Sequence, residues 1–180
     1  ATLHSKNITL QERAHGDGIR IDFDSPEAFE EVFWRMHYGN IYINENVLKV
    51  HDVTKKVLLE LNKYHELVCS KYSKSKYLAK NNNLMLRMGS ISKQEPSIVF
   101  LVMFRNPINQ AKSLLSQHKN FSNSESFIQD YMHWLAHYEF GDMHRPFQFD
   151  KSNSYDNPVD TIDYWLQRWI DAYTHLLQLL

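Results

Sequence analysis

The feature that most constrains the fold of this chain is an uninterrupted apolar run, IVFLVMF at residues 98–104, which ends on Arg105. Seven apolar residues without alternation predict a strand that is buried on both faces, as in a parallel sheet covered by helices. Asn106 is a good N-cap and Pro107 suits the first helical position, so we expect a helix over residues 107–118. The pattern predicts one strand–turn–helix unit of an α/β sheet.

This unit brings together two groups that can bind a phosphate. Ligands of open α/β sheets bind at the carboxyl edge of the strands, where Arg105 is expected. Ser113 lies six residues beyond Pro107, so its hydroxyl could face a group held by Arg105. The guanidinium offers a bidentate clamp and the serine a single hydrogen bond. The alternative is an ordinary charge at a strand end and a tolerated helical serine.

The sequence Arg-Asn-Pro with a serine eight positions after the arginine resembles the sulfotransferases that use 3′-phosphoadenosine 5′-phosphosulfate (PAPS). In that family the arginine and the serine bind the 3′-phosphate of the nucleotide. The four residues Arg105, Asn106, Pro107 and Ser113 match the family pattern one for one. The resemblance implies PAPS as co-substrate, with Arg105 and Ser113 as its ligands.

A second match lies at Lys80, in the segment YLAKNNN of residues 77–83. We expect residues 77–79 to end a short strand and the three asparagines to form a polar junction to a helix. Lys80 matches the family's strand-end lysine, whose ammonium faces the transferring sulfuryl group. A fixed cation there stabilises charge that builds on the reacting oxygens. Without the resemblance, Lys80 is a solvated surface lysine.

Two candidates remain for the general base, because Asn82 stands where part of the family has a histidine and an amide cannot take the proton. The first is Glu31, in DSPEAFEEVFW at residues 24–34, which is predicted to be a helix with acids in its first turn. Its end resembles the segment of glycosaminoglycan-type sulfotransferases in which the glutamate is the base. The alternative is a surface acid favoured by the helix dipole.

The second candidate is His15, in a polar turn His-Gly-Asp-Gly. The usual pKa of histidine, near 6.5, suits proton transfer at neutral pH. This turn and the helix that follows resemble a bacterial branch of the sulfotransferase superfamily, which makes His15 a residue on the substrate side. An ordinary Asp-Gly turn is the alternative.

The resemblance implies a three-layer α/β/α fold with a central parallel sheet, of the P-loop nucleotide-kinase-like kind. The family's loop for the 5′-phosphosulfate, of the type Pro-Arg-Ser-Gly-Thr-Thr, is not found, and none of the five glycines has that setting. We therefore expect residues 1–180 to be a single partial domain, an internal piece of a longer sulfotransferase. Further helices are expected over residues 46–72, 124–140 and 159–180, with a loop over residues 141–157.

Composition narrows the possible partners. A formal charge of −1 argues against a general nucleic-acid binder, and no apolar run is long enough to span a membrane. The single Cys69 excludes an internal disulfide and suits a reducing compartment, which favours the cytoplasm. His133 and His137 have the spacing of two metal ligands on one helical face, near Glu139 and His144, but local geometry places only these two ligands and the family needs no metal. We expect no metal site.

The expected activity is transfer of a sulfuryl group from PAPS to a hydroxyl or amine of a small-molecule or glycan acceptor, and the oligomeric state stays open. The alternative is a non-catalytic or degenerate nucleotide-binding module of the same fold. A kinase-like phosphotransferase is a weaker alternative, because it would also need a glycine-rich loop. For residues 1–180 alone we expect weak binding of adenosine 3′,5′-bisphosphate and little turnover.

Overall fold

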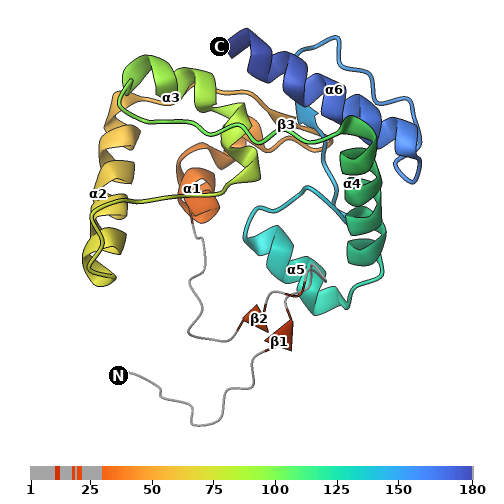
Figure 1. The fold of residues 1–180 in the computed structure, drawn as a ribbon, viewed down its shortest axis with the longest axis horizontal. Helices are drawn as coiled ribbons and strands as arrows, with labels where there is room; N and C mark the ends of the chain where they lie inside the picture. Colours follow the sequence, from red (N-terminus) through yellow and green to blue (C-terminus); the bar gives the residue numbers. More distant parts are fainter. Residues whose placement is uncertain (1–10, 13–17, 19, 22–29, 180) are drawn as a thin grey trace.

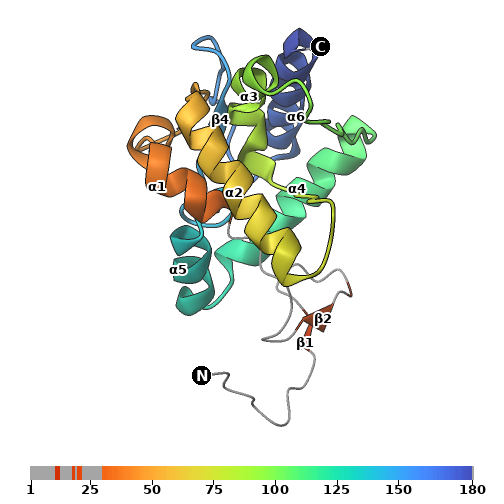
Figure 2. The same ribbon diagram turned by 90° about the vertical axis from the view of Figure 1, so that its left-hand side faces the viewer.

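The computed structural model describes residues 11–12, 18, 20–21 and 30–179 (Figures 1 and 2). Helices account for most of this part of the chain. They are α1 (Glu30–Tyr42), α2 (Lys55–Lys71), the 3-10 helix η1 (Asn82–Leu86), α3 (Met88–Gln94), α4 (Pro107–Ser122), α5 (Ser126–Trp134) and α6 (Ile162–Leu179). The strands are β1 (Gln11–Glu12), β2 (Arg20–Ile21), β3 (Leu48–Lys49) and β4 (Phe147–Gln148).

The described strands form two small sheets. β1 pairs with β2 in antiparallel fashion. β3 pairs with β4 in parallel, with Leu48 opposite Phe147 and Lys49 opposite Gln148. The described chain is thus a helix-rich mixed fold with a short parallel sheet, which agrees with the α/β expectation at this coarse level.

The larger core forms where α1 and α2 meet. Trp34, Tyr38 and Tyr42 of α1 are four residues apart and lie on one face of the helix, where all three are buried. Val57 and Leu61 face this core from α2, which begins after its N-cap Thr54. The cap is itself held by α1, because the Thr54 amide donates to the Tyr38 hydroxyl at 2.8 Å.

A smaller core joins α4 to α6, which lie side by side in Figure 1. Ala111 of α4 is fully buried against Tyr164 and Trp165 of α6. The Trp165 indole donates to the Val159 carbonyl at 2.8 Å, which fixes the loop before α6. This core holds α4 against α6.

The prediction of a buried strand over residues 98–104 is wrong. This segment lies outside the strands that the structure describes. Ile98 and Phe100 pack on the larger core, whereas Val99, Leu101 and Met103 are 75–82% exposed. Only the first part of the run covers the core, through Ile98 and Phe100, and the described chain supplies no neighbouring strand for its backbone.

The predicted start of α4 is confirmed. Pro107 is its first residue, and the Asn106 side chain accepts a hydrogen bond from the Asn109 amide at 3.1 Å. The helix continues to Ser122, four residues past the expected end. The predicted helix at residues 24–34 is described from Glu30 onwards, where α1 runs on to Tyr42.

Other helix boundaries differ from the expected ones for local reasons. The helix expected from residue 46 begins at Lys55, because β3 occupies residues 48–49. The helix expected over residues 124–140 ends at Trp134, since Ala136 adopts a φ of 60°, which interrupts a helix. Residues 77–79 form no strand, and β4 lies inside the expected loop. None of the described helices is both long and apolar enough to cross a membrane.

Candidate active site around Lys80

Lys80 and Glu31 line the same small cavity. Its volume is about 40 Å³, and its other lining residues are Glu30, Ala79, Asn81, Asn82 and His137. Lys80 is exposed, and no ion pair joins it to a carboxylate among the described residues. The structure therefore brings two of the predicted catalytic residues together.

The asparagines after Lys80 fix the position of its backbone. Asn81 is the N-cap of η1, and its side-chain amide donates to Glu31 at 2.7 Å. Asn82 donates to Glu139 Oε1 at 3.0 Å. Asn83 is fully buried and donates to the Ala136 carbonyl at 3.3 Å. The segment that the sequence indicates only as a polar junction is thus tied to α1 and to the chain after α5.

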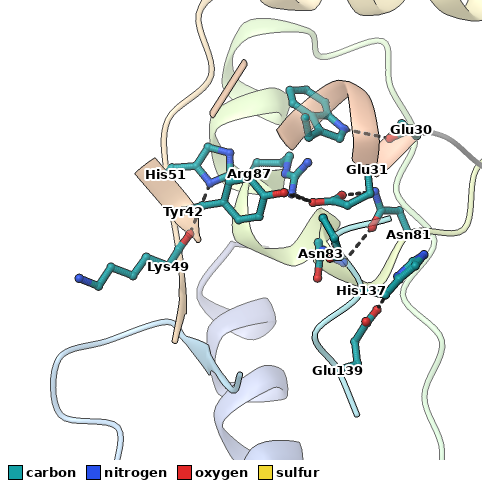
Figure 3. A network of polar contacts seen from close by, with 12 residues as sticks. Glu30, Glu31, Tyr42, Lys49, His51, Asn81, Asn83, Arg87, His137 and Glu139 are labelled. Atoms are coloured by element: carbon teal, nitrogen blue, oxygen red, sulfur yellow. Dashed lines mark hydrogen bonds and ion pairs between the residues drawn. The ribbon is translucent and has the colours of Figure 1, made fainter. Parts of the chain in front are cut away.

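Glu31 is at the centre of a buried polar network (Figure 3). Its carboxylate accepts hydrogen bonds from the Tyr42 hydroxyl at 2.6 Å, from Arg87 Nη2 at 2.9 Å and from Asn81 at 2.7 Å. Glu31 and Arg87 are only 2% and 1% exposed. Burial, together with the Glu31 charge, raises the pKa of Tyr42 well above its usual value. Both carboxylate oxygens are engaged, which limits Glu31 as an acceptor of a substrate proton.

The planar guanidinium of Arg87 is contacted on its faces by aromatic rings as well as at its edge by Glu31. Its guanidinium carbon lies 4.7 Å from the Trp34 ring centre and 5.1 Å from that of Tyr42. Cation–π contacts of this kind are stronger when water is excluded. Sequence reasoning did not identify Arg87, because its partners are far away along the chain.

Glu30 adds an ionised carboxylate beside Lys80. It accepts from Trp34 Nε1 at 3.2 Å and from the Tyr77 hydroxyl at 3.3 Å, and His65 Nε2 lies 3.8 Å from its Oε2. Burial by itself favours the neutral acid, but the contacts with His65 and Trp34 outweigh it and lower the pKa of Glu30. Negative charge therefore lines the cavity next to the lysine.

His137, which lines the same cavity, pairs with Glu139. His137 Nδ1 lies 3.3 Å from Glu139 Oε1. Burial opposes protonation of His137, but the hydrogen bond and the charge of Glu139 outweigh it and raise the pKa of His137. With Nδ1 directed to Glu139, the second ring nitrogen points away from that carboxylate (Figure 3). This nitrogen can accept a proton. The sequence signal was local, a histidine two residues before a glutamate.

Arg105 and Ser113 lie elsewhere, at the start of α4. Arg105 is exposed directly before the N-cap Asn106, and Ser113 is half-buried within the helix. Neither residue lines the cavity of Lys80. His15, the other candidate base, lies outside the described residues.

The prediction that His133 and His137 share one helical face is wrong, because α5 ends at Trp134. In the described part of the chain no three residues among histidine, cysteine, aspartate and glutamate converge as metal ligands. Burial and the charge of Arg35 lower the pKa of His133.

The comparisons with known proteins add no relative. No family model matches the chain, and no match was found among curated proteins or among solved structures. A function therefore has to be argued from the chemistry of the chain's own residues.

Proposed function

We propose that this chain belongs to a PAPS-dependent sulfotransferase and transfers a sulfuryl group to a hydroxyl or amine. The observation that supports the proposal is the cavity in which Lys80, free of a carboxylate partner among the described residues, lies beside the His137–Glu139 pair. A cation for the transferring group and a base for the acceptor proton are thus available in one place. The sequence match at Arg105 and Ser113 indicates where the nucleotide would bind.

Each group has a defined part in the transfer. The acceptor oxygen or nitrogen forms a bond to sulfur as the bond between sulfur and the bridging phosphate oxygen breaks. Negative charge grows on the leaving oxygen, and the Lys80 ammonium stabilises it. The acceptor proton passes to Nε2 of His137, and Glu139 stabilises the imidazolium that forms.

The other two candidate bases stay predictions. Glu31 already accepts three hydrogen bonds, one of them from the buried Arg87, so proton removal would compete with those contacts. In our proposal it holds Arg87 and, through Asn81, the backbone next to Lys80. His15 is left as a residue on the acceptor side.

At the nucleotide end, Arg105 and Ser113 would bind the 3′-phosphate. The Arg105 guanidinium is exposed, and no carboxylate pairs with it among the described residues. It lies at the N-terminus of α4, where a helix favours negative charge. A guanidinium there fits a phosphate in a bidentate manner.

The second candidate is a nucleotide-binding module without catalysis. It is favoured by residues 99 and 101–104, which are exposed and form no strand in the described chain, so that no sheet supports Arg105. The two functions differ in one respect, since the module binds the nucleotide but transfers nothing.

Transfer from radiolabelled PAPS to a panel of sugars, phenols and amines tests the proposal. Lys80→Ala should lower the rate about 10²- to 10³-fold, as expected for loss of one fixed charge-stabilising group. Lys76→Ala, at an exposed position four residues before Lys80, should leave the rate unchanged. His137→Gln should lower the rate about 10²-fold or more and remove the acidic limb of the pH profile.

The outcomes separate the alternatives. Nucleotide binding without transfer to any acceptor would support the module. Equal rates for Lys80→Ala and Lys76→Ala would refute Lys80 as the residue that faces the sulfuryl group. An unchanged pH profile in His137→Gln would refute His137 as the base and return the choice to Glu31 and His15.

A further inference from the structure

A second and much larger cavity lies between α4 and the loops before β3 and α6. Its volume is about 480 Å³, within the range of small-molecule sites. Its polar lining includes Asn46, His118, Asp142, His144, Asn157 and Tyr164. None of the residues proposed for sulfuryl transfer or for the nucleotide lines it, so the proposed function leaves this cavity without a role.

The protonation state of His144 is fixed by its neighbours. Its Nδ1 must carry a proton, because it donates to the Tyr138 carbonyl at 3.2 Å. Its Nε2 then accepts from the Tyr164 hydroxyl at 2.8 Å. Burial and the nearby His118 lower the pKa of His144 to about 4. The ring is neutral at physiological pH.

His118 has the opposite tautomer. The Gly141 amide donates to its Nδ1 at 3.3 Å, so the proton resides on Nε2. Within the described part of the chain this N–H has no acceptor, although His118 is only 8% exposed. Burial also lowers the pKa of His118. The cavity wall therefore offers a neutral N–H donor that is accessible to a ligand.

The described lining of the cavity favours neither an anion nor a cation. Among its described lining residues Asp142 alone is charged, and none is lysine or arginine. A cationic ligand would depend on this exposed carboxylate, and an exposed ion pair contributes little. The Arg168 guanidinium already covers one face of Tyr155 at 4.4 Å and of Tyr164 at 4.9 Å.

We propose that this cavity binds an uncharged polyhydroxylated ligand, namely a sugar ring. His118, Tyr164, Asp142, Asn46 and Asn157 line the cavity from several segments of the chain and carry hydrogen-bonding groups. A ligand with one hydroxyl would leave most of them unused. Val47, Pro146 and Val159 supply apolar surface for the C–H face of the ring. The proposal does not depend on sulfuryl transfer.

Titration of the whole chain with methyl glycosides of glucose, galactose, mannose and N-acetylglucosamine tests this site. The ring nitrogens of His118 and His144 are followed by NMR, and Trp165, whose ring centre lies 5.1 Å from that of His144, reports by fluorescence. At least one neutral glycoside should saturate with a dissociation constant on the order of 1 mM. Sodium glucuronate and methyl glucosaminide differ from the neutral glycosides mainly in charge. Both should bind at least about tenfold more weakly than the best neutral glycoside.

Variants locate the binding. His118→Phe keeps an aromatic ring but removes the donor, and it should weaken binding of the best glycoside at least about tenfold. The matched control is His37→Phe, since His37 lies on α1 and not at this cavity. Asn157→Ala at the exposed rim should weaken binding several-fold and keeps the test open if His118→Phe fails to fold. The proposal is overturned if no glycoside saturates or if glucuronate binds as tightly as the best neutral glycoside. It is also overturned if folded His118→Phe and Asn157→Ala both bind the glycoside as tightly as the native chain does.

Discussion

The region around Lys80 and the region around Arg105 carry the two halves of one proposed site, yet they are built differently. Near Lys80, each asparagine from Asn81 to Asn83 makes a hydrogen bond to a distant element, and the Glu31–Arg87 ion pair lies beneath them with almost no exposure. Arg105 stands exposed between the N-cap of α4 and the uncovered side chain of Phe104.

The two halves of the proposed site place different demands on the structure. Groups that stabilise a transition state have to be fixed before the reaction, and in our proposal the hydrogen bonds of Asn81–Asn83 fix the backbone next to Lys80. A phosphate clamp can form when the phosphate arrives, at a cost in side-chain entropy. We therefore expect mutations to unfold the chain in the first region and to affect ligand binding in the second.

The largest expected effect comes from Arg87→Met. It leaves Glu31 buried without its counter-charge and should lower the free energy of unfolding by about 3 to 5 kcal/mol. Arg105→Ala is the matched control at an exposed arginine, with an expected change within about 0.5 kcal/mol. Urea denaturation measures both. The double variant Glu31→Gln/Arg87→Met should regain part of the lost stability. Equal losses in Arg87→Met and Arg105→Ala would contradict the contrast between the two regions.

Two leucines sharpen the same contrast with identical chemistry. Leu86 is fully buried and Leu101 is 75% exposed. Leu86→Ala should lower the free energy of unfolding by about 2 to 5 kcal/mol, because it leaves a cavity. Leu101→Ala should change it by less than about 0.5 kcal/mol. A large loss in Leu101→Ala would mean that residues 98–104 are covered in solution.

The pH dependence of stability tests burial near Glu31. His51 is 6% exposed and stacks on Tyr42, and burial, with the Arg87 charge, lowers its pKa from 6.5 to about 4. Below pH 6.5 the unfolded chain binds a proton that the folded chain does not. Stability should therefore fall by about 2 to 3 kcal/mol from this residue as the pH decreases from 6.5 to about 4.

Thermal or urea unfolding at a series of pH values measures this decrease in stability. His51→Gln should remove the contribution of His51 to the decrease, whereas the control His37→Gln should leave that contribution in place. The raised pKa of His137 acts with the opposite sign, since its contribution is present below 6.5 and is lost as the pH rises through the folded value. The burial account of His51 fails if His51→Gln leaves the slope unchanged.

The smallest effect belongs to the start of α4. Asn106→Ala removes the side chain that accepts from the Asn109 amide and should lower the free energy of unfolding by about 1 kcal/mol. Asn120→Ala, at an exposed position within α4, serves as the control and should have no destabilising effect. The same loss in both variants would show that the cap is not formed in solution.

The start of α4 was predicted from a local capping signal. Asn106 followed by Pro107 fixes a helix start with its own side chains, and α4 begins there. The run at residues 98–104 carried no information about its neighbours, because burial on both faces depends on strands and helices that other segments must provide. The small parallel sheet instead forms from β3 and β4, which no apolar run marked.

For the candidate site too, residues in short motifs were predicted and contacts between distant segments were not. Lys80 and Glu31 were identified through short motifs, and the structure brings them to one cavity. Arg87 escaped notice because its ion pair with Glu31 joins segments far apart in sequence. His137 with Glu139 could have been identified from their spacing, but the helical interpretation paired His137 with His133 instead.

The most direct test of the central claim is calorimetry with adenosine 3′,5′-bisphosphate and, as the matched ligand without the 3′-phosphate, adenosine 5′-monophosphate. The native chain should bind the bisphosphate more tightly. Arg105→Ala should remove that preference and weaken bisphosphate binding by on the order of 1.5 to 3 kcal/mol, roughly 10- to 150-fold, with a smaller loss in Ser113→Ala. Equal binding of the bisphosphate by the native chain and Arg105→Ala would contradict the assignment of this chain to PAPS chemistry.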